Sequence, residues 1–450
     1  MPSSHDTNWR DSINRLGVAL QIPDLRRRLL FIAGMFGLFI VGLHVPAPFV
    51  DAKAIEKIAS TGVFGLIDIM SGGAFKRLSI LALGIVPYIN ASIIMQLLGI
   101  AVPQVQRLQK EGETGRKIIS TYTRIGTVVL AVLQGAGLGL FLYNQGAVTL
   151  TKFGFLGVLP LIIVMTAGTS FLMWMGEQLT DKGIGNGISL IIFAGILIRL
   201  PSTFGSIFVL AFTHSADNII KAVLLISAIV LIFVAIVVFI TWVHQATRQI
   251  PIQHAKRVVG NRVFSTASTY LPLKIATAGV IPIIFAISVV MLPATISKML
   301  EQRHVTGWWV KGMSFLSPGY HWFGAVLYFL LVVFFTYFYT AVIYNVQDIS
   351  DNLKKHGSFV PGLRPGKQTE KYIDFVLTRV TFAGAIFLGI VALLPYTIPV
   401  LLRAFGVGEE ANLFPLWGGT SLLIVVGVAL ETMKQIEAHL VMRRYEGFIK

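Results

Sequence analysis

Ten apolar runs separated by polar connections dominate the hydropathy pattern of this 450-residue chain. Each run is about 20 residues long, the length that an α-helix needs to cross the hydrocarbon core of a bilayer. The runs lack the two-residue alternation of barrel strands, and only helices and closed barrels satisfy their backbone hydrogen bonds in lipid. The pattern therefore predicts ten transmembrane helices, at about residues 29–50, 78–101, 118–142, 154–176, 184–204, 219–243, 275–297, 322–345, 373–398 and 414–433.

The composition agrees with a polytopic, all-α membrane protein. Hydrophobic residues make up 55% of the chain and charged residues 13%, whereas a typical soluble chain has about 25% charged residues. The chain contains no Cys, which excludes disulfides and thiolate metal sites.

Catalytic motifs are absent from the sequence. It contains neither HExxH nor GxSxG, and "GETGRK" (residues 112–117) differs from a phosphate-binding loop at the positions around Lys117. The nine His residues are scattered and form no ligand pair. We therefore expect no enzymatic activity, no metal and no cofactor.

The 37 Lys and Arg residues are distributed unevenly between the connections. By the positive-inside rule, the N-terminus (residues 1–28), the tail (434–450) and two long loops at about 244–274 and 346–372 are predicted to be cytoplasmic. The net charge of +16 fits attraction to anionic lipids. It fits equally well a basic surface for nucleic acid or an acidic protein. The length of the two loops favours docking of a large partner.

Two motifs recur in spans that are five apart. "GIVPYINAS" (residues 84–92) and "GVIPIIFAIS" (279–288) share Gly, Pro, Ile and Ala at the same offsets, and "GISLII" (187–192) matches "GTSLLI" (419–424). A repeat of five spans crosses the membrane in the opposite sense the second time, which gives inverted halves with a translocation path at their interface. The matched prolines are expected to kink helix interiors.

The repeat pairs Ile89 with Ile284, and Ile192 with Ile424. Four branched aliphatic side chains around a two-fold axis would form a narrow, dry waist that blocks ions. Charged residues are almost absent from the middles of the spans, whereas ion-coupled transporters usually keep one there. The pattern favours a pathway that closes against ions without binding them.

A short apolar segment lies between the first two spans. Residues 63–70 are too few to cross a bilayer, and Ser71, Gly72 and Gly73 follow them. The segment is predicted to be a half-inserted helix on a flexible hinge. It is either an interfacial helix at the outer surface or a movable stopper under the waist.

Long motifs resemble the SecY family, the central subunit of the bacterial protein-conducting channel. The resemblance extends from about residue 22 to about 445, and it rests on "MSGGAFKRLSILALGIVPYINASIIMQLL" (70–98), "KEGETGRK" (110–117), "FLMWMGEQLTDKGIGNGISLIIFAGI" (171–196), "DNLKKHGSFVPGLRPGKQTEKYID" (351–374) and "GGTSLLIVVGVALE" (418–431). It implies ten transmembrane helices in two inverted five-helix halves, residues 29–204 and 205–433, around a central hourglass pore. Unfolded secretory chains would cross this pore, and membrane segments would leave it sideways.

The resemblance also implies roles for individual residues. A pore ring falls on Ile85, Ile89, Ile192, Ile284, Ser288 and Ile424. A plug covers about residues 61–73, with Val63, Phe64, Leu66, Ile67, Ile69, Met70, Gly72 and Gly73. A lateral gate includes Asn90 and Gln134. Docking of a motor or ribosome falls on Lys256, Arg257, Arg262, Lys354, Lys355 and Arg364.

Two positions depart from the usual pattern of the family. Ala276 stands where Asn is familiar, and Asn261 stands where a second Arg is common. The implied partners are SecE- and SecG-like small membrane subunits, a SecA-like motor ATPase, the ribosome, unfolded client proteins and anionic lipids. The implied location is the bacterial cytoplasmic membrane, with both termini cytoplasmic.

Two other classes of function are compatible with parts of the pattern. An ion-coupled secondary transporter of a small solute also has inverted repeats and broken helices. A membrane scaffold that only docks partners would also need large loops. The missing midplane charges and the long basic loops favour the channel.

Overall fold

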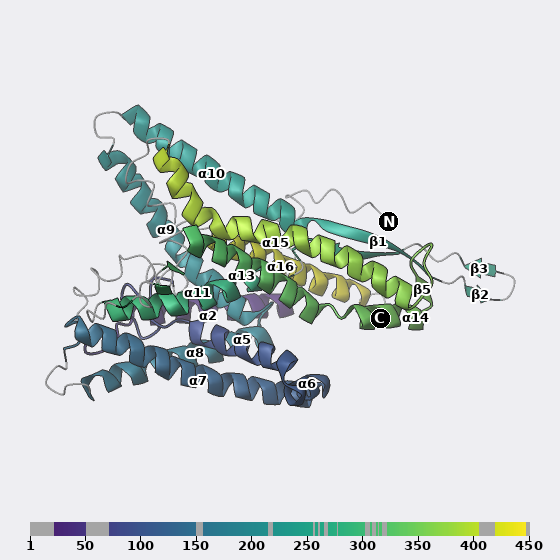
Figure 1. The fold of residues 1–450 in the computed structure, drawn as a ribbon, viewed down its shortest axis with the longest axis horizontal. Coiled ribbons are helices and arrows are strands. Elements are labelled where there is room, and N and C mark those ends of the chain that lie inside the picture. The colour runs from purple at the N-terminus through teal and green to yellow at the C-terminus, as the bar shows by residue number, and fades with distance from the viewer. Residues whose placement is uncertain are drawn as a thin grey trace. The chain divides into compact units, whose positions relative to one another are not determined.

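The computed structural model describes residues 22–50, 72–149, 156–214, 219–254, 257–259, 262–264, 269–276, 278–301, 307, 312–313, 315–316, 322–404 and 419–446 (Figure 1). The chain divides into two compact units, Met1–Ser206 with Ile424–Lys450, and Ile207–Leu423. The first boundary lies two residues after the predicted end of the first half at residue 204. Most of the last helix groups with the first unit.

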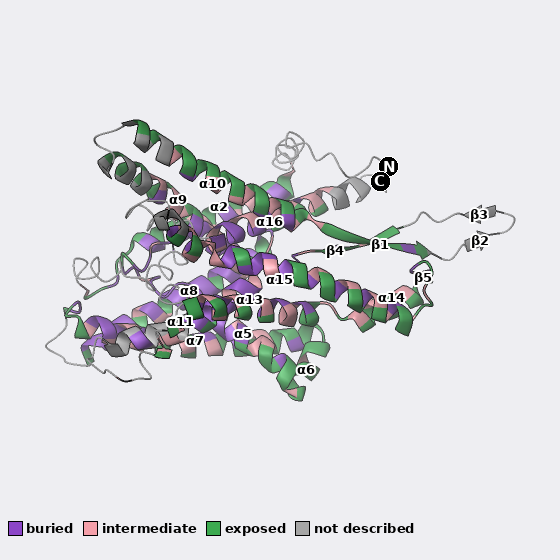
Figure 2. Ribbon diagram, turned by 45° about the horizontal axis from the view of Figure 1, so that its top comes forward, coloured by how far each residue is buried: buried purple, intermediate pink, exposed green. Residues whose placement is uncertain are grey.

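The first unit is built around α8. Its elements are α2 (Pro23–His44), α5 (Val86–Ala101), α6 (Pro103–Lys110), α7 (Glu113–Asn144), α8 (Leu159–Lys182), the first part of α9 (Gly187–His214) and most of α16 (Gly419–Glu446). Helix α7 packs against α5 and α8, and α2 packs against α8. Leu161, Met165, Leu172, Met175 and Leu179 form a helical stripe on α8 and are at most 1% exposed. This stripe is the centre of the unit's core (Figure 2).

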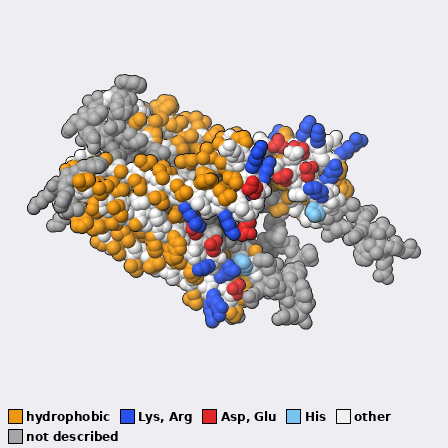
Figure 3. All heavy atoms as spheres, turned by 90° about the horizontal axis from the view of Figure 1, so that it is seen from below, with side chains coloured by type: hydrophobic (Ala, Val, Ile, Leu, Met, Phe, Trp, Pro, Cys, Tyr) orange, Lys and Arg blue, Asp and Glu red, His pale blue; other side chains and the backbone are white. Residues whose placement is uncertain are grey.

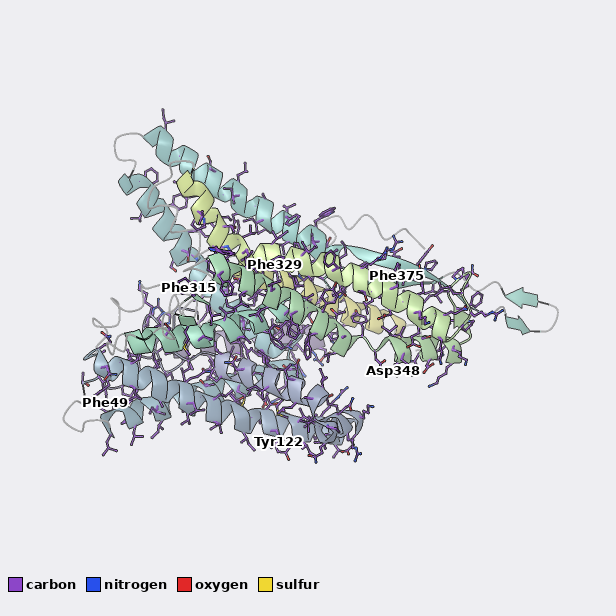
Figure 4. All side chains as sticks on the ribbon, in the orientation of Figure 1. Phe49, Tyr122, Phe315, Phe329, Asp348 and Phe375 are labelled. Carbon is purple, nitrogen blue, oxygen red and sulfur yellow. The ribbon has the colours of Figure 1, made fainter. Side chains whose placement is uncertain are left out.

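The second unit combines helices with a small sheet. Its elements are α10 (Ile219–Gln245), β1 (Thr247–His254), β2 (Arg257–Val259), β3 (Arg262–Phe264), β4 (Thr269–Lys274), α11 (Ile281–Glu301), α13 (Trp322–Ile343), α14 (Val346–Lys355), β5 (Ser358–Phe359) and α15 (Lys367–Ala404). Helix α13 packs against α11 and α15. The ring of Phe329 on α13 lies directly against Gly389 of α15, where any side chain would meet it (Figure 4).

The predicted spans correspond to helices in the described part of the chain. Eight of those helices are long and apolar enough to cross a membrane, and the pair α5 and α6, bent by 100°, would make a ninth. The remaining predicted span, residues 275–297, overlaps α11, in which Ile281–Val290 forms a shorter apolar helix. Large side chains such as Ile163, Leu231 and Trp242 are 66–71% exposed, as expected for surfaces that face lipid. Hydrophobic side chains cover much of the face drawn in Figure 3.

The prediction that the matched prolines kink helix interiors is wrong. Pro87 lies in the first turn of α5, and Pro282 is the second residue of α11. Proline is tolerated there because the first backbone N–H groups of a helix have no partner within the helix. The residues before each proline form turns, so the predicted spans at 78–101 and 275–297 begin several residues ahead of their helices.

The internal repeat is visible in the local backbone. Gly84 and Gly279 have φ angles of 60° and 61°, in the left-handed region that glycine adopts without strain. In each case the glycine N–H donates to the carbonyl oxygen three residues earlier, that of Leu81 at 2.8 Å and that of Ala276 at 3.1 Å. Each helix starts two residues after its glycine. The shared glycines therefore form the same turn in both units.

Two further pairs of glycines pack in the same way in both units. A side chain on Gly168 of α8 would meet the carbonyl oxygen of Ile80, and one on Gly384 of α15 would meet that of Ile275. Ile80 and Ile275 each lie four residues before the matched turn glycine. The first residues of α9 and α16 repeat this pattern, because a side chain on Gly187 would meet a carbonyl oxygen of α8, and one on Gly419 a carbonyl oxygen of α15.

We expect Gly187→Ala and Gly419→Ala to destabilise the protein by about 1–3 kcal/mol each, the usual effect of overpacking. The neighbouring groups are backbone and Cβ atoms, with Leu179 Cβ at 2.7 Å from a methyl added to Gly187, so they cannot rotate away. Gly205→Ala on the same helix is the control, since nothing lies within 4 Å of the added methyl. Thermal unfolding of the purified protein in detergent measures the difference, and equal midpoints for Gly187→Ala and Gly205→Ala would contradict the prediction.

Candidate functional site

The two long loops of the second unit fold together into one structure, here called the loop module (β1, β4, β5, α14 and the first turns of α15). Strands order as β4–β1–β5, with Ile250 opposite Leu271. A hydrophobic cluster fills the space between the sheet and the two helices. Its buried members are Ile250, Leu273, Val360, Ile373 and Leu377. The loop module therefore has a core of its own.

Arg364 is exposed on a loop that this core holds in place. Its backbone N–H donates to Gln368 Oε1 at 3.2 Å, and its carbonyl oxygen accepts from Thr369 Oγ1 at 3.0 Å. Two residues on, the carbonyl oxygen of Gly366 accepts from Ser350 Oγ of α14 at 3.0 Å. Because the backbone on both sides is bonded, the Arg364 side chain projects from a fixed point.

The other predicted docking residues lie in two places. Lys354 and Lys355 are exposed in the last turn of α14, where cations interact favourably with the helix dipole. Arg257 and Arg262 belong to the β2–β3 hairpin, in which Arg257 pairs with Phe264 and Arg262 with Val259. Lys256 and Asn261 lie outside the described residues.

The predicted pore-ring residues are divided between the units. Ile85, Ile89, Ile192 and Ile424 belong to the first unit and are 2–6% exposed. Ser288 of the second unit is 6% exposed, and Ile284, one helical turn before it on α11, is half-buried. Each of these side chains is thus at least partly buried.

The predicted plug falls mostly outside the described residues, which include only Gly72 and Gly73 of it. Both have positive φ angles, 71° and 88°. A methyl on Gly72 would lie 2.9 Å from Gly195 Cα on α9, whereas nothing lies within 4 Å of one on Gly73. The segment after the predicted plug, residues 72–85, is here called the stalk. Gly72 lets the stalk approach the backbone of α9 closely.

The predicted gate residues lie on two helices that pack together. Asn90 on α5 is 9% exposed, and Gln134 on α7 is half-buried. Ala276, the departure from the family pattern, is 6% exposed in the turn before α11.

The sequence interpretation missed an ion pair between α7 and α8. Arg124 Nε of α7 lies 2.7 Å from Glu177 Oε1 of α8, with side-chain exposures of 52% and 23%. From the sequence alone, Arg124 is only a charge at the start of a span. The signal in the sequence is a positive residue, Arg124, and a negative residue, Glu177, which lie near the same predicted membrane surface on consecutive antiparallel spans. This pair ties α7, which carries Gln134, to α8.

Among the described residues, no group of three or more His, Asp or Glu side chains is placed to hold a metal ion. The predicted site residues within the described stretches carry apolar, hydroxyl, amide and cationic side chains, a set suited to sealing a narrow path and to binding anionic groups.

Comparison with protein families gives a match to the SecY family over residues 79–433. The protein translocase subunit SecY of Streptomyces galbus is 43% identical over 447 residues, covering 96% of this chain and 98% of the relative.

Two solved structures have a similar fold. One is a SecY protein whose plug domain is described as stabilising the closed state of the translocation channel (TM-score 0.63, 18% identity, 95% of this chain and 97% of that one). The other is the channel of a canine ribosome–channel complex from the endoplasmic reticulum (TM-score 0.61, 17% identity, 95% and 97%). The predicted helical, multi-pass membrane fold is confirmed.

The sequence match to a relative that is 43% identical covers nearly the full length of the chain. The fold, with its turn glycine repeated in both units, agrees with this match. This chain belongs to the SecY family.

Proposed function

We propose that this protein is the channel subunit of a protein translocase, a passive and gated pore through which unfolded secretory chains cross and from which membrane segments leave sideways. The observation that carries the proposal is the 43% identity, over 96% of the chain, to a protein translocase subunit. The comparisons give no support to the alternative of a solute transporter.

In this proposal, Ile85, Ile89, Ile192, Ile284, Ser288 and Ile424 form a ring that seals the closed pore. A ring of branched aliphatic side chains expels water from a narrow constriction. The segment at about residues 61–73 is the plug, and Asn90 and Gln134 belong to the lateral gate. The close packing of Gly72 on Gly195 supports a defined position for the stalk.

The loop module is the proposed docking site for the machines that feed the channel. Its fixed, exposed Arg364 supports this role, because a guanidinium held in place forms bidentate contacts with carboxylate or phosphate at low entropic cost. Partners are a SecA-like motor ATPase and the ribosome, with SecE- and SecG-like subunits and anionic lipids around the spans. The structure of a related channel in a ribosome complex supports the second partner.

The proposed location is the bacterial cytoplasmic membrane, with both termini and the loop module in the cytoplasm, since these carry the larger share of Lys and Arg. The chain has no catalytic site of its own in this proposal, and the driving energy comes from its partners.

Photo-crosslinking tests the proposed path. A photo-reactive amino acid is placed at Ile89 of the first unit or Ile284 of the second, in membranes that carry a stalled secretory chain. We expect both positions to crosslink to that chain, because the proposed path runs between the two inverted halves of the repeat. The control position is Ile163, a 66% exposed side chain on α8.

Crosslinks from Ile163 alone, or from none of the three positions while the chain is demonstrably engaged at the membrane, would contradict the proposed path.

A further inference from the structure

An arginine marks the point at which α15 enters the apolar part of its sequence. After Arg379, residues 380–402 include no charged side chain. At about 1.5 Å of rise per residue, this stretch is long enough to cross the hydrocarbon core of a bilayer. Arg379 therefore lies where α15 meets the membrane surface, on the side of the loop module.

An aromatic ring holds the guanidinium of Arg379. Its Cζ lies 4.0 Å from the centre of the Phe375 ring, one turn earlier on the same helix (Figure 4). A cation over the face of a ring is attracted by the negative charge of that face. A guanidinium that stacks on a ring keeps the N–H donors along its edge for other partners. Arg379 is exposed, so these donors are accessible.

The carboxylates of α15 do not compensate the charge of Arg379. The acidic residues of the helix, Glu370 and Asp374, precede Arg379 by nine and five residues. Neither offset is close to a whole number of 3.6-residue turns, so both lie on other faces of the helix. Among the described residues, no carboxylate forms an ion pair with Arg379. The site is therefore open to an anion from outside the chain.

The face of α15 that carries Arg379 continues into the apolar stretch. Phe382 and Ile390 follow Arg379 by three and eleven residues, offsets that place them on the same face of the helix. Phe375, Phe382 and Ile390 are 50–54% exposed. Together with Arg379 they are here called the α15 stripe. Exposed apolar side chains on the membrane-crossing part of a helix contact lipid, so Arg379 lies at the headgroup end of a lipid-facing surface.

A second cation marks the same membrane surface beside α15. Lys274 is the last residue of β4 and is exposed, and residues 275–297 after it include no charged side chain. The carbonyl oxygen of Ile275 lies directly against Gly384 of α15. Lys274 thus reaches the membrane surface next to the helix that carries Arg379, and it adds to the positive potential there.

We propose that Arg379, held by Phe375, binds the phosphate group of an anionic phospholipid in the leaflet on the side of the loop module. A guanidinium forms bidentate hydrogen bonds with phosphate oxygens. Basic side chains next to a span attract anionic headgroups. The acyl chains of the lipid lie along Phe382 and Ile390. This site rests on the proposed function, in which anionic lipids surround the spans, and gives one of those lipids a position.

A fluorescent label on the α15 stripe measures the local lipid preference. The chain has no cysteine, so Phe382→Cys provides a single labelling position. The labelled full chain, in its translocase complex, is reconstituted in phosphatidylcholine vesicles. Phosphatidylglycerol or phosphatidylcholine with nitroxide-labelled acyl chains is then included at the same mole fraction as a quencher. We expect phosphatidylglycerol to be preferred about fivefold, the contribution of one basic side chain near a membrane surface.

Two variants identify the group that gives the preference. Arg379→Gln keeps N–H donors without the charge and is expected to reduce the preference to about one. Arg379→Lys keeps the charge without the planar fork and should retain part of it. Equal quenching by the two lipids in the parent, or an unchanged preference in Arg379→Gln, would overturn the site.

A second labelling position is the matched control. Ile125 of α7 is 57% exposed and follows Arg124, whose guanidinium is already paired with Glu177 at 2.7 Å. A label at Ile125→Cys should therefore show little preference. The same preference at both positions would show general attraction to a basic surface and would remove the specific site. A label at Phe382→Cys that neither lipid quenches would show that a protein partner covers the α15 stripe, which also overturns the proposal.

The lipid site and the proposed function can fail separately, because the quenching measurement needs neither a motor nor a client protein. A complex that prefers phosphatidylglycerol at the α15 stripe but exports no secretory protein keeps the site and counts against the function. A complex that exports normally without this preference loses only the site.

Discussion

Replacing Arg364 with Glu is expected to reduce motor-driven export by roughly thirtyfold or more, since losing a central Arg contact typically costs about 2 kcal/mol or more of binding free energy. The side chain is exposed and has no place in the hydrophobic core of the loop module. The hydrogen bonds with the side chains of Gln368 and Thr369 are made by the backbone N–H and carbonyl oxygen of Arg364, so they survive the substitution. Folding and membrane insertion should therefore be unchanged.

Two comparisons isolate the role of the guanidinium. Lys367→Glu reverses another charge three residues along the chain and should leave export within about twofold of the parent, as expected of a charge away from the contact. Arg364→Lys keeps the charge but loses the planar fork, so it should fall between the parent and Arg364→Glu.

Export of a secretory protein into inverted membrane vesicles, with a motor ATPase added, measures all three variants at matched expression. Normal export by a well-expressed Arg364→Glu protein would remove the proposed role. Full activity of Arg364→Lys would instead indicate that only the charge matters.

The positions of the spans could be predicted from the sequence, because a bilayer demands a minimum apolar length whatever the tertiary fold. The starts of two helices could not. Pro87 and Pro282 lie in apolar runs that continue on both sides, and hydropathy does not distinguish a helix interior from a first turn. The left-handed φ angles of Gly84 and Gly279 decide this, and they are properties of the folded backbone.

The sheet of the loop module was not predicted, although its signal is present. "TRQIPIQH" (residues 247–254) places Ile250 and Ile252 two apart, and both are at most 5% exposed. What buries Ile250 is Val360 and Ile373, more than 100 residues further along the chain. From the sequence alone, a polar and basic loop is therefore predicted to lack regular secondary structure, because its partners lie far along the chain. The ion pair Arg124–Glu177 was missed for the same reason, since it depends on which helices pack together.

The sequence around Arg364 explains part of the geometry of the loop that carries it. Pro361 and Pro365 flank Arg364 in the sequence, and in the structure side chains of α14 and α15 donate hydrogen bonds to the backbone of this loop. Gly362 and Gly366 have φ angles of 82° and 103°, which explains why glycine stands on both sides of Arg364. The glycines thus account for the backbone conformation of this loop, whereas its attachment to β1 is visible only in the fold.

Replacing Ile89, Ile192, Ile284 and Ile424 together with Asn is expected to make the resting channel leak ions by at least about tenfold over the parent, since a polar constriction of the same width holds water. Replacing the four with Gly should leak more, because the constriction also widens. Single-channel conductance of the complex, without a motor or client, measures the leak.

A matched control separates the ring from a general loss of packing. Leu172, Met175, Leu179 and Tyr328 are even more deeply buried than the ring residues, at no more than 1% exposure, and lie on α8 and α13 outside the proposed ring. Cavity-forming substitutions there, such as Leu172→Ala with Leu179→Ala, should lower stability by about 2–5 kcal/mol each. They should not raise conductance in the protein that remains folded.

Under the proposed function, the changes in stability and in conductance are therefore expected in different sets of variants. The ring variants conduct in the protein that remains folded, whereas the α8 variants lose stability while staying sealed. A quadruple variant that conducts no more than the parent would show that these isoleucines do not form the seal. Leakage of equal size from the Leu172→Ala, Leu179→Ala variant would show that any loosened core opens the channel. The four isoleucines would then have no specific role in the seal.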